Sequence, residues 1–515
     1  MTISGSGSAL RSAVVVVTAG GSSGLLYWGA IPPTSALPLA WVCLLPGLLA
    51  ACRLPSRSLV VCAALAGIAS GIGRVYWIAD TLVLYGNVPD LAALLTNALL
   101  IAYLSLYWIA YFLLCARFDP QSPTFPWLAA SAWVVLEWMQ SWVITGFPWA
   151  LLGYALHDSQ LLLQTASLAG IYGLSFLVAL VNAAIAQYLH LMGRPVRTLL
   201  PSALLILAAL LYGSYRWHAL EPPTGPSVTV GVVQGNITQD EKWDPDRLGR
   251  TVAAYEELTR DLAAAASPDL IVFPETALPM YFRDPSYAPL SRRITALASD
   301  IGIPLIVGSL DGSRSDPEAR IYNRAFLVDA TGEIVDHADK VHLVPFGEYL
   351  PLPFLFGYLE GLTAESGRFA PGIQHKRLAA GGTDLGIFVC FESVFPGITR
   401  FLAANGAKIL VNTTNDAWFG HSAAPHQHFA MAGVRAVETG RSVVRAANTG
   451  ISGLLSPRGE ILAATELFAT EALVLEVSPR TEMTPYVRFG DVLVGLCAVA
   501  LIGGFARVRN TRLTR

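Results

Sequence analysis

Long apolar runs fill the first part of the chain and return once near its end. A helix that crosses a bilayer needs about 20 mostly apolar residues. Eight runs come close to that length and predict membrane spans, with approximate edges, at 12–31, 35–52, 58–78, 91–115, 126–145, 160–190, 198–216 and 489–506. The first run has no clear cleavage site before the next, so we interpret it as a span rather than a signal peptide.

From Val228 the pattern changes to short β-rich runs that alternate with amphipathic helices. Apolar residues three and four positions apart predict helices over 244–265, 287–300 and 423–439. Strands are predicted at 228–233, 270–273, 304–308, 325–329, 333–336, 385–390, 408–412, 442–447, 451–455 and 472–477. The alternation favours one α/β domain whose helices cover a sheet. We therefore expect membrane helices in 1–216, a polar domain in 217–488, and a last span with a basic tail in 489–515.

Composition supports this division. Hydrophobic residues make up 53% of the 515 positions and charged residues 14%, against about 25% charged residues in soluble proteins. The chain is therefore expected to be a membrane protein with a substantial water-exposed part. Its net charge of −3 gives no reason to expect a nucleic acid partner.

Arginine placement predicts the orientation, because basic loops stay in the cytoplasm. With the N-terminus inside, the cytoplasmic ends would carry Arg11, Arg53, Arg57, Arg117, Arg194, Arg197 and the basic tail. The opposite short loops at 32–34, 79–90 and 146–159 contain no lysine or arginine. Domain 217–488 is thus expected on the outer face. Arg74 is an exception that we expect to extend its charged end to the membrane interface.

Glu137 is an acid within a predicted span. Such residues are functional candidates by default. An acid that is only hydrogen-bonded between helices explains the sequence equally well, and both interpretations stay open.

Cys390 is the only cysteine of the polar domain, which excludes a disulfide within that domain. It ends a predicted buried strand, where it is either a nucleophile or a small buried apolar residue. Glu275 and Lys340 also follow predicted strands. Taken singly, Glu275 could cap a helix and Lys340 could be solvated. Their occurrence together at strand ends favours a catalytic group.

Nucleophilic catalysis by a thiol needs these residue types. A thiol attacks an ester as the thiolate, so a base must remove its proton. We expect Glu275, with a pKa raised by burial, to act as base and then acid. Lys340 would stabilise the oxyanion of the tetrahedral intermediate, a contribution of roughly 3 kcal/mol for one such donor. Cys390 would be the nucleophile.

A metal site formed by Asp416 with His421, His426 and His428 is the alternative chemistry in this region. The tight ligand spacing of a metalloprotease motif is absent, so we interpret these histidines as helix-surface residues at the pocket rim. No metal or cofactor is expected.

Three stretches resemble the nitrilase superfamily, whose αββα sandwich carries a Glu-Lys-Cys triad: 273–276, 340–349 and 389–392. Seven spans before such a domain and one after it resemble the apolipoprotein N-acyltransferases of bacterial envelopes. The stretches 146–149 and 411–420, and Trp243, are similar to that family as well. Phe391 departs from the tyrosine that usually follows the nucleophile.

The resemblance implies a bacterial inner-membrane enzyme with a periplasmic catalytic domain. It would move a fatty acyl group from a phospholipid, through a thioester on Cys390, to the N-terminal α-amino group of a diacylglyceryl-cysteine apolipoprotein. Glu348 would support the site beside Lys340. Glu392 would orient its neighbours, Trp243 would support the site, and Trp418 would contact substrate.

Two other functions fit the pattern. One is a membrane-tethered nitrilase-type amidase that acts on a small soluble substrate. The other is a transporter or receptor with an outer ligand domain, which the small number of charges in the predicted spans disfavours. An amidase would work without lipid, and a transporter would tolerate the loss of Cys390.

The apolar, proline-rich run 350–359 follows Glu348 and is poorly suited to a regular element. We hypothesise a lid that dips into the outer leaflet and carries Phe354 and Phe356. A loop packed on the domain's own core is the alternative. Changing both phenylalanines to serine should slow lipid-dependent acylation of a well-folded protein, measured as lysophospholipid release. Full activity would contradict the hypothesis.

The arginine pattern also predicts topology. Cysteines introduced at Ser313 and in the C-terminal tail should react with membrane-impermeant reagents from opposite sides of the membrane. The reason is that the tail carries the basic residues that stay in the cytoplasm. Labelling of both positions from one side would overturn the orientation.

Overall fold

The computed structural model describes residues 4–86, 88–192, 198–220, 226–313, 315–316, 318–349 and 369–513. The chain divides into two compact units. A helical unit combines Met1–Asp80, Pro89–Ala219 and Phe489–Arg515. An α/β unit combines Thr81–Val88 with Leu220–Arg488. The hypothesised lid, with Phe354 and Phe356, lies outside the described residues.

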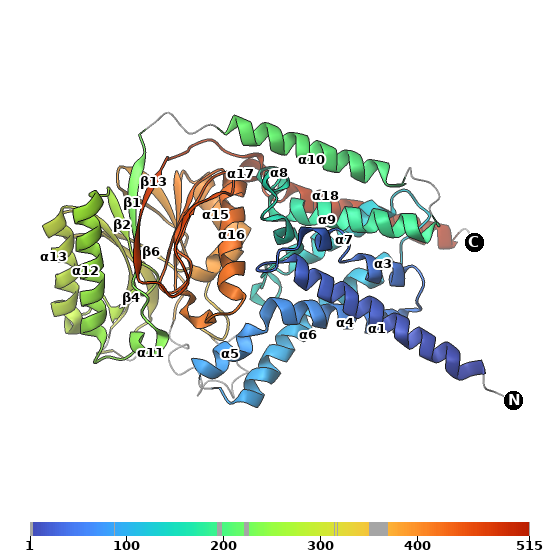
Figure 1. The fold of residues 1–515 in the computed structure, drawn as a ribbon, viewed down its shortest axis with the longest axis horizontal. Coiled ribbons are helices and arrows are strands. Elements are labelled where there is room, and N and C mark those ends of the chain that lie inside the picture. The colour runs from blue at the N-terminus through green and yellow to red at the C-terminus, as the bar shows by residue number, and fades with distance from the viewer. Residues whose placement is uncertain are drawn as a thin grey trace. The chain divides into compact units, whose positions relative to one another are not determined.

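The helical unit is built from apolar helices joined by short turns (Figure 1). The described helices are α1 (Ser4–Ala30), α2 (Leu37–Ala40), α3 (Leu45–Ala51), α4 (Ser56–Val75), α5 (Trp77–Leu84), α6 (Asp90–Cys115), α7 (Phe125–Met139), α8 (Gln160–Leu163), α9 (Ala166–His190), α10 (Leu200–Ala219) and α18 (Val492–Leu513). The 3₁₀ turns η1 (Val143–Thr145) and η2 (Leu152–Leu156) lie between α7 and α8. Helix α5 runs from this unit into the α/β unit.

Within the described residues, four helices are long and apolar enough to cross a membrane: Ser12–Ala30, Ser56–Val75, Asp90–Cys115 and Ala166–His190. The expected total of eight spans is not confirmed. The run 35–52 is divided into α2 and α3, and a proline stands in the first turn of each helix. Proline has no N–H to donate, so it suits a helix start and interrupts a continuous helix. Helix α7 ends at Met139, short of the predicted edge at 145.

Charged side chains buried inside the helical unit include Arg74 and Glu137. Nε of Arg74 donates to the Trp149 carbonyl at 2.9 Å, and its guanidinium also reaches Gln140. The prediction that Arg74 extends to the interface is therefore wrong, because the side chain is only 2% exposed. Oε1 of Glu137 accepts a 2.7 Å hydrogen bond from the Leu152 amide, which favours the structural interpretation of this acid.

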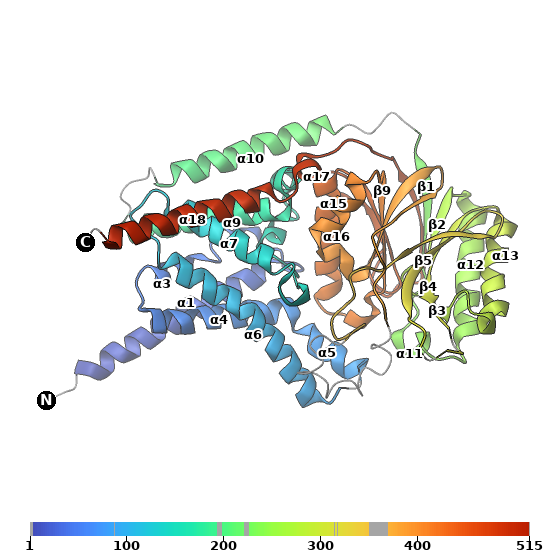
Figure 2. The same ribbon diagram turned by 180° about the vertical axis from the view of Figure 1, so that it is seen from behind.

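The α/β unit contains two sheets that face each other (Figure 2). The first has the order β13-β1-β2-β4-β5-β6, with β3 paired to β4. Its strands are β1 (Val228–Gln234), β2 (Leu270–Val272), β3 (Leu278–Tyr281), β4 (Leu305–Asp311), β5 (Tyr322–Val328), β6 (Ile334–Asp339) and β13 (Glu471–Val477). The second has the order β12-β11-β10-β9-β8-β7. Its strands are β7 (Arg377–Ala380), β8 (Thr383–Val389), β9 (Ile409–Thr414), β10 (Val443–Ala447), β11 (Gly453–Leu455) and β12 (Ile461–Ala464).

Helices cover the outer face of each sheet and complete an αββα sandwich (Figures 1 and 2). Helices α12 (Leu248–Ala266) and α13 (Ala288–Ile301) cover the first sheet, and α15 (Pro396–Ala404) and α16 (Ala424–Thr439) cover the second. Period-2 alternation directs Ile306 of β4 into the core between the sheets. Its neighbours Leu305 and Val307 pack in the helix-facing core. Both faces of the central strands are thus buried.

The predicted strands and helices of this unit correspond to observed elements, with edges shifted by a few residues. Sequence periodicity missed β3, β7, β12 and α15, and also the short helices α11 (Gln239–Lys242) and α17 (Pro485–Phe489). Strand β3 contains Pro279, and β7 and β12 are short strands, so none of them produces a clear alternation. Helix α15 is too short for a sustained helical pattern.

Gly308 of β4 lets the chain approach Glu275 closely. A Cβ added at this glycine would lie 1.8 Å from the Pro274 carbonyl oxygen. A larger residue would therefore push away the segment that carries Glu275. The absence of a side chain at 308 helps to fix this candidate base relative to the sheet.

Candidate active site

Cys390 lies at the carboxyl end of β8, where it begins the 3₁₀ turn η7 (Cys390–Val394). Its φ is +50°, a left-handed conformation that is uncommon for a residue with a side chain. Such backbone persists only where the surroundings fix it, and it occurs often at functional sites. The residue is 7% exposed.

A buried polar cluster holds the Cys390 carbonyl. Nε2 of His428 lies 3.0 Å from this oxygen and must donate to it, because a carbonyl can only accept. Arg445 donates to Asp416 and lies 2.9 Å from Nδ1 of His428. Burial and the Arg445 charge lower the pKa of His428, while Asp416, whose Oδ1 lies 3.0 Å from Nδ1, and the Cys390 carbonyl act to raise it. The prediction of a surface histidine is wrong for His428, which is fully buried.

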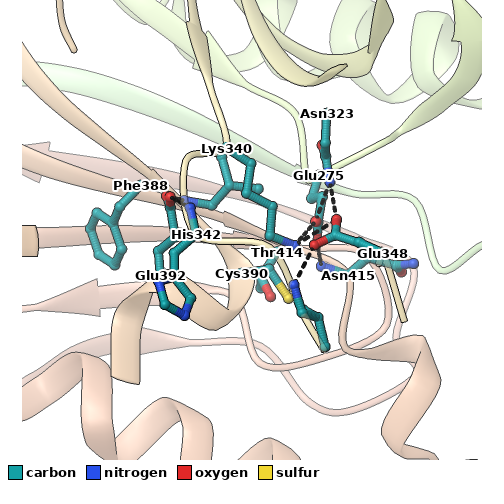
Figure 3. A network of polar contacts seen from close by, with 12 residues as sticks. Glu275, Asn323, Lys340, His342, Glu348, Phe388, Cys390, Glu392, Thr414 and Asn415 are labelled. Atoms are coloured by element: carbon teal, nitrogen blue, oxygen red, sulfur yellow. Dashed lines mark hydrogen bonds and ion pairs between the residues drawn. The ribbon is translucent and has the colours of Figure 1, made fainter. Parts of the chain in front are cut away.

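Glu275, Lys340 and Glu348 meet at the carboxyl ends of the first sheet's strands. Nζ of Lys340 lies 3.0 Å from Oε1 of Glu275 and 2.9 Å from Oε1 of Glu348. Asn323 of β5 donates to the same Glu275 oxygen at 2.6 Å. Figure 3 shows these side chains pointing toward one another, with Cys390 beside them. The structure thus brings together the residues that the sequence singled out.

The second sheet also contributes to the binding of the Glu275 carboxylate. The Asn415 amide follows β9 and donates to Oε2 of Glu275 at 2.8 Å. Burial raises the pKa of Glu275, but Lys340, Lys242 and the Asn323 hydrogen bond together bring it below its usual value. The expectation of a raised pKa was therefore wrong. The sequence indicates that Glu275 is buried. It does not indicate how many positive charges and hydrogen-bond donors counter the effect of burial on its pKa.

The pKa of the Cys390 thiol is shifted in the opposite direction, above its usual value. Burial and the negative charge of Glu275 raise its pKa, while Lys340 and a hydrogen bond with Thr414 lower it. Burial also lowers the pKa of Lys340, but Glu275 and Glu348 raise it well above its usual value. The resting site therefore contains a thiol, an ammonium and a carboxylate. After burial, the negative charge of Glu275 is the largest effect that opposes formation of the thiolate. Moving the thiol proton to Glu275 neutralises that charge.

Glu392 connects the loop after Lys340 to the turn that contains Cys390. Its Oε1 accepts from the amides of Val341 and His342 at 2.7 and 2.9 Å, and its Oε2 accepts from Val389 at 2.7 Å. Burial raises the pKa of Glu392 to about 7, against the effect of these three donors. One fully buried carboxyl group thereby sets the positions of the residues beside Lys340 and Cys390.

The remaining predicted residues do not contact Glu275 or Lys340 in the interactions described above. Trp243 is 37% exposed. The carbonyl of Trp418 accepts from Thr81 at 2.8 Å, and its ring lies edge-on to Tyr85. Phe391 is buried against the rings of His342 and Phe395, so the position usually taken by tyrosine serves apolar packing here.

Sequence reasoning missed Lys242, Asn323, Asn415 and the His428 cluster. Lys242 had a usable signal, because the chain contains only four lysines and this one precedes Trp243. The other residues are common polar types in or beside strands, and nothing local distinguishes them. In the part of the chain that the structure describes, no cluster of three or more His, Cys, Asp or Glu side chains could hold a metal ion.

An αββα sandwich with Glu, Lys and Cys grouped at its strand ends defines a nitrilase-type domain. The carbon–nitrogen hydrolase family model matches residues 229–486, and the model of the apolipoprotein N-acyltransferase N-terminal domain matches 23–184. The chain is 38% identical to the apolipoprotein N-acyltransferase of Geobacter metallireducens, covering 92% of each chain. It is 34% identical to that of Nitrosomonas europaea, covering 86% of this chain and 88% of the relative.

The chain belongs to the apolipoprotein N-acyltransferase family. It is a membrane protein with a nitrilase-like α/β domain. Among solved structures, an amidase from Nesterenkonia sp. is 21% identical with a TM-score of 0.39, covering 53% of this chain and 97% of the amidase.

The contacts of Glu392 predict the effect of removing one acceptor. In Glu392→Gln the amide NH₂ would face a backbone N–H, which leaves a buried donor unsatisfied at a cost of about 1–3 kcal/mol. We expect a lower unfolding temperature and slower acylation of Cys390, measured by thermal denaturation and intact-protein mass spectrometry. The control Glu333→Gln changes an exposed acid in the β5–β6 turn and should alter neither. Equal behaviour of the two variants would contradict the role of Glu392.

Proposed function

We propose that this protein transfers a fatty acyl chain from a phospholipid, through a thioester on Cys390, to the N-terminal α-amino group of a diacylglyceryl-modified apolipoprotein. The observation that carries the proposal is the buried group of Glu275, Lys340 and Cys390 in a chain of the apolipoprotein N-acyltransferase family. Glu348, Glu392 and Trp243 support the site, and Trp418 is the proposed substrate contact.

The first half-reaction forms the thioester. Glu275 accepts the thiol proton, and the Cys390 thiolate attacks the carbonyl carbon of a phospholipid ester. The tetrahedral oxyanion is stabilised by the Lys340 ammonium, whose charge is strong in a water-poor site. When the C–O bond breaks, Glu275 returns the proton to the leaving alkoxide. Lysophospholipid departs, and the acyl group stays on sulfur.

The second half-reaction discharges the thioester. The apolipoprotein amine attacks the thioester carbonyl, and Lys340 again faces the oxyanion. Glu275 accepts a proton from the amine and passes it to the departing Cys390 thiolate. Lys340, Asn323 and the Asn415 amide hold the two oxygens of Glu275 in place while the carboxylate acts first as base and then as acid.

The proposed setting is the bacterial inner membrane, where both substrates reside. We propose helical parts at 1–216 and 489–515 with about eight spans, both termini in the cytoplasm, and the domain 217–488 in the periplasm. The arginine-free loops between the predicted spans support this orientation. The small-substrate amidase remains the alternative, and the family relatives disfavour it.

The mechanism predicts ping-pong kinetics with a stable acyl-enzyme. With phospholipid alone, the protein should gain one fatty acyl mass on Cys390 and release lysophospholipid in a burst, and apolipoprotein should then discharge the adduct. Cys390→Ala should form no adduct, and Cys390→Ser almost none. Glu275→Gln and Lys340→Met should lose at least about 100-fold in adduct formation, since each removes a group that acts on the reacting atoms.

The matched control is Cys52→Ala, which removes a partly buried cysteine of the helical unit and should acylate normally. An adduct that persists in Cys390→Ala would refute the assignment of the nucleophile. A protein that hydrolyses small amides and is never acylated by phospholipid would instead support the amidase.

A further inference from the structure

Lys242 is a buried lysine that the proposed mechanism does not use. It ends the short helix α11 (Gln239–Lys242) and is 1% exposed. Its Nζ donates to the backbone carbonyl of Glu275 at 3.1 Å. The chain's other lysines outside the site, Lys376 and Lys408, are 43% and 37% exposed and pair with surface acids. Burying a lysine is costly without a strong electrostatic reason.

The surroundings of Lys242 supply that reason. The titratable groups that act on it are Glu275, which follows β2, and Cys390, which follows β8. On its own helix, Asp240 is exposed and Glu241 pairs with Arg247. Burial lowers the pKa of Lys242 to about 7, while the charges of Glu275 and Cys390 act to raise it. Lys242 is therefore only partly protonated at neutral pH, and a more negative site raises the fraction that carries the ammonium.

The net charge around Cys390 determines how a second ammonium would affect formation of its thiolate. Glu275 and Glu348 are both in contact with the single ammonium of Lys340, which leaves the cluster with a net negative charge. A negative cluster opposes formation of a thiolate beside it. When the Cys390 proton moves to Glu275, the S–H electron pair stays on sulfur and the total charge is unchanged. The cost of placing that charge on a buried sulfur still depends on the cations around it.

We propose that Lys242 is a positioning residue that holds the Glu275 backbone and supplies the second positive charge needed to form the Cys390 thiolate. This inference rests on the proposed function, because it assigns Cys390 as the nucleophile. The hydrogen bond to the Glu275 carbonyl fixes where the charge lies. Thr276, directly after Glu275, has a φ of +44°, so the same contact steadies a strained segment that carries the base.

The test measures the rate at which iodoacetamide alkylates Cys390 in the full-length protein, as a function of pH, by mass spectrometry of the Cys390 peptide. Lys242→Met removes both the hydrogen bond and the charge. Lys242→Gln keeps an N–H donor and removes the charge, and Lys242→Arg keeps both. The control Lys408→Met removes a partly exposed lysine that pairs with Asp384.

We expect alkylation about 10-fold slower near neutral pH in Lys242→Met and Lys242→Gln, with the apparent pKa of Cys390 raised by about one unit. Lys242→Arg and Lys408→Met should match the unmodified protein. A folded Lys242→Gln protein with an unchanged alkylation profile would overturn the proposal, even if its acyl transfer were impaired. Because alkylation needs neither lipid nor apolipoprotein, this outcome is independent of whether phospholipid acylates Cys390.

Discussion

The buried Lys340 ammonium is the interaction on which the α/β unit's site depends. It contacts Glu275 and Glu348 at about 3 Å, and all three side chains are largely removed from water. Buried charges are tolerated only when they are paired and hydrogen-bonded. Asn323, the Asn415 amide and the Val344 amide provide the remaining bonds to these carboxylates. The strand ends of both sheets must therefore keep fixed positions around the Lys340 ammonium.

The proposed nucleophile, Cys390, depends on a second set of constraints. Cys390 adopts a left-handed backbone that its own residue type does not favour. His428 holds its carbonyl from the side of α16, and Glu392 holds the preceding amide while it also binds the loop after Lys340. These contacts pass between segments far apart in the sequence. The relative positions of thiol and ammonium are thus set before any substrate binds, as pre-organised catalysis requires.

Much of this unit could be predicted from sequence, because its strands alternate and its helices show apolar residues three and four apart. Glu275, Lys340 and Cys390 were recognisable because they occur together, each at or shortly after the end of a predicted strand. The role of His428 was not, since it comes from partners distant in the chain, and Lys242 offered only the signal of a rare lysine beside Trp243. The predicted direction of the Glu275 pKa shift was wrong for the same reason. Burial can be predicted from the sequence pattern, but the full set of surrounding cations and donors cannot. In the helical unit, hydropathy placed the apolar runs but not the breaks at prolines such as Pro46.

Burial of Cys390 has two opposite consequences for the proposed chemistry. It raises the pKa of the thiol, so the resting residue is protonated and reacts slowly with adventitious electrophiles. The same exclusion of water would protect a thioester from hydrolysis until an amine arrives. A site that only needed a reactive thiol could leave it exposed beside a cation. A site that must hold an acyl group away from water needs a base and fixed positive charges to generate the thiolate. In the proposed mechanism, Glu275 is that base, and Lys340 and Lys242 supply the positive charges.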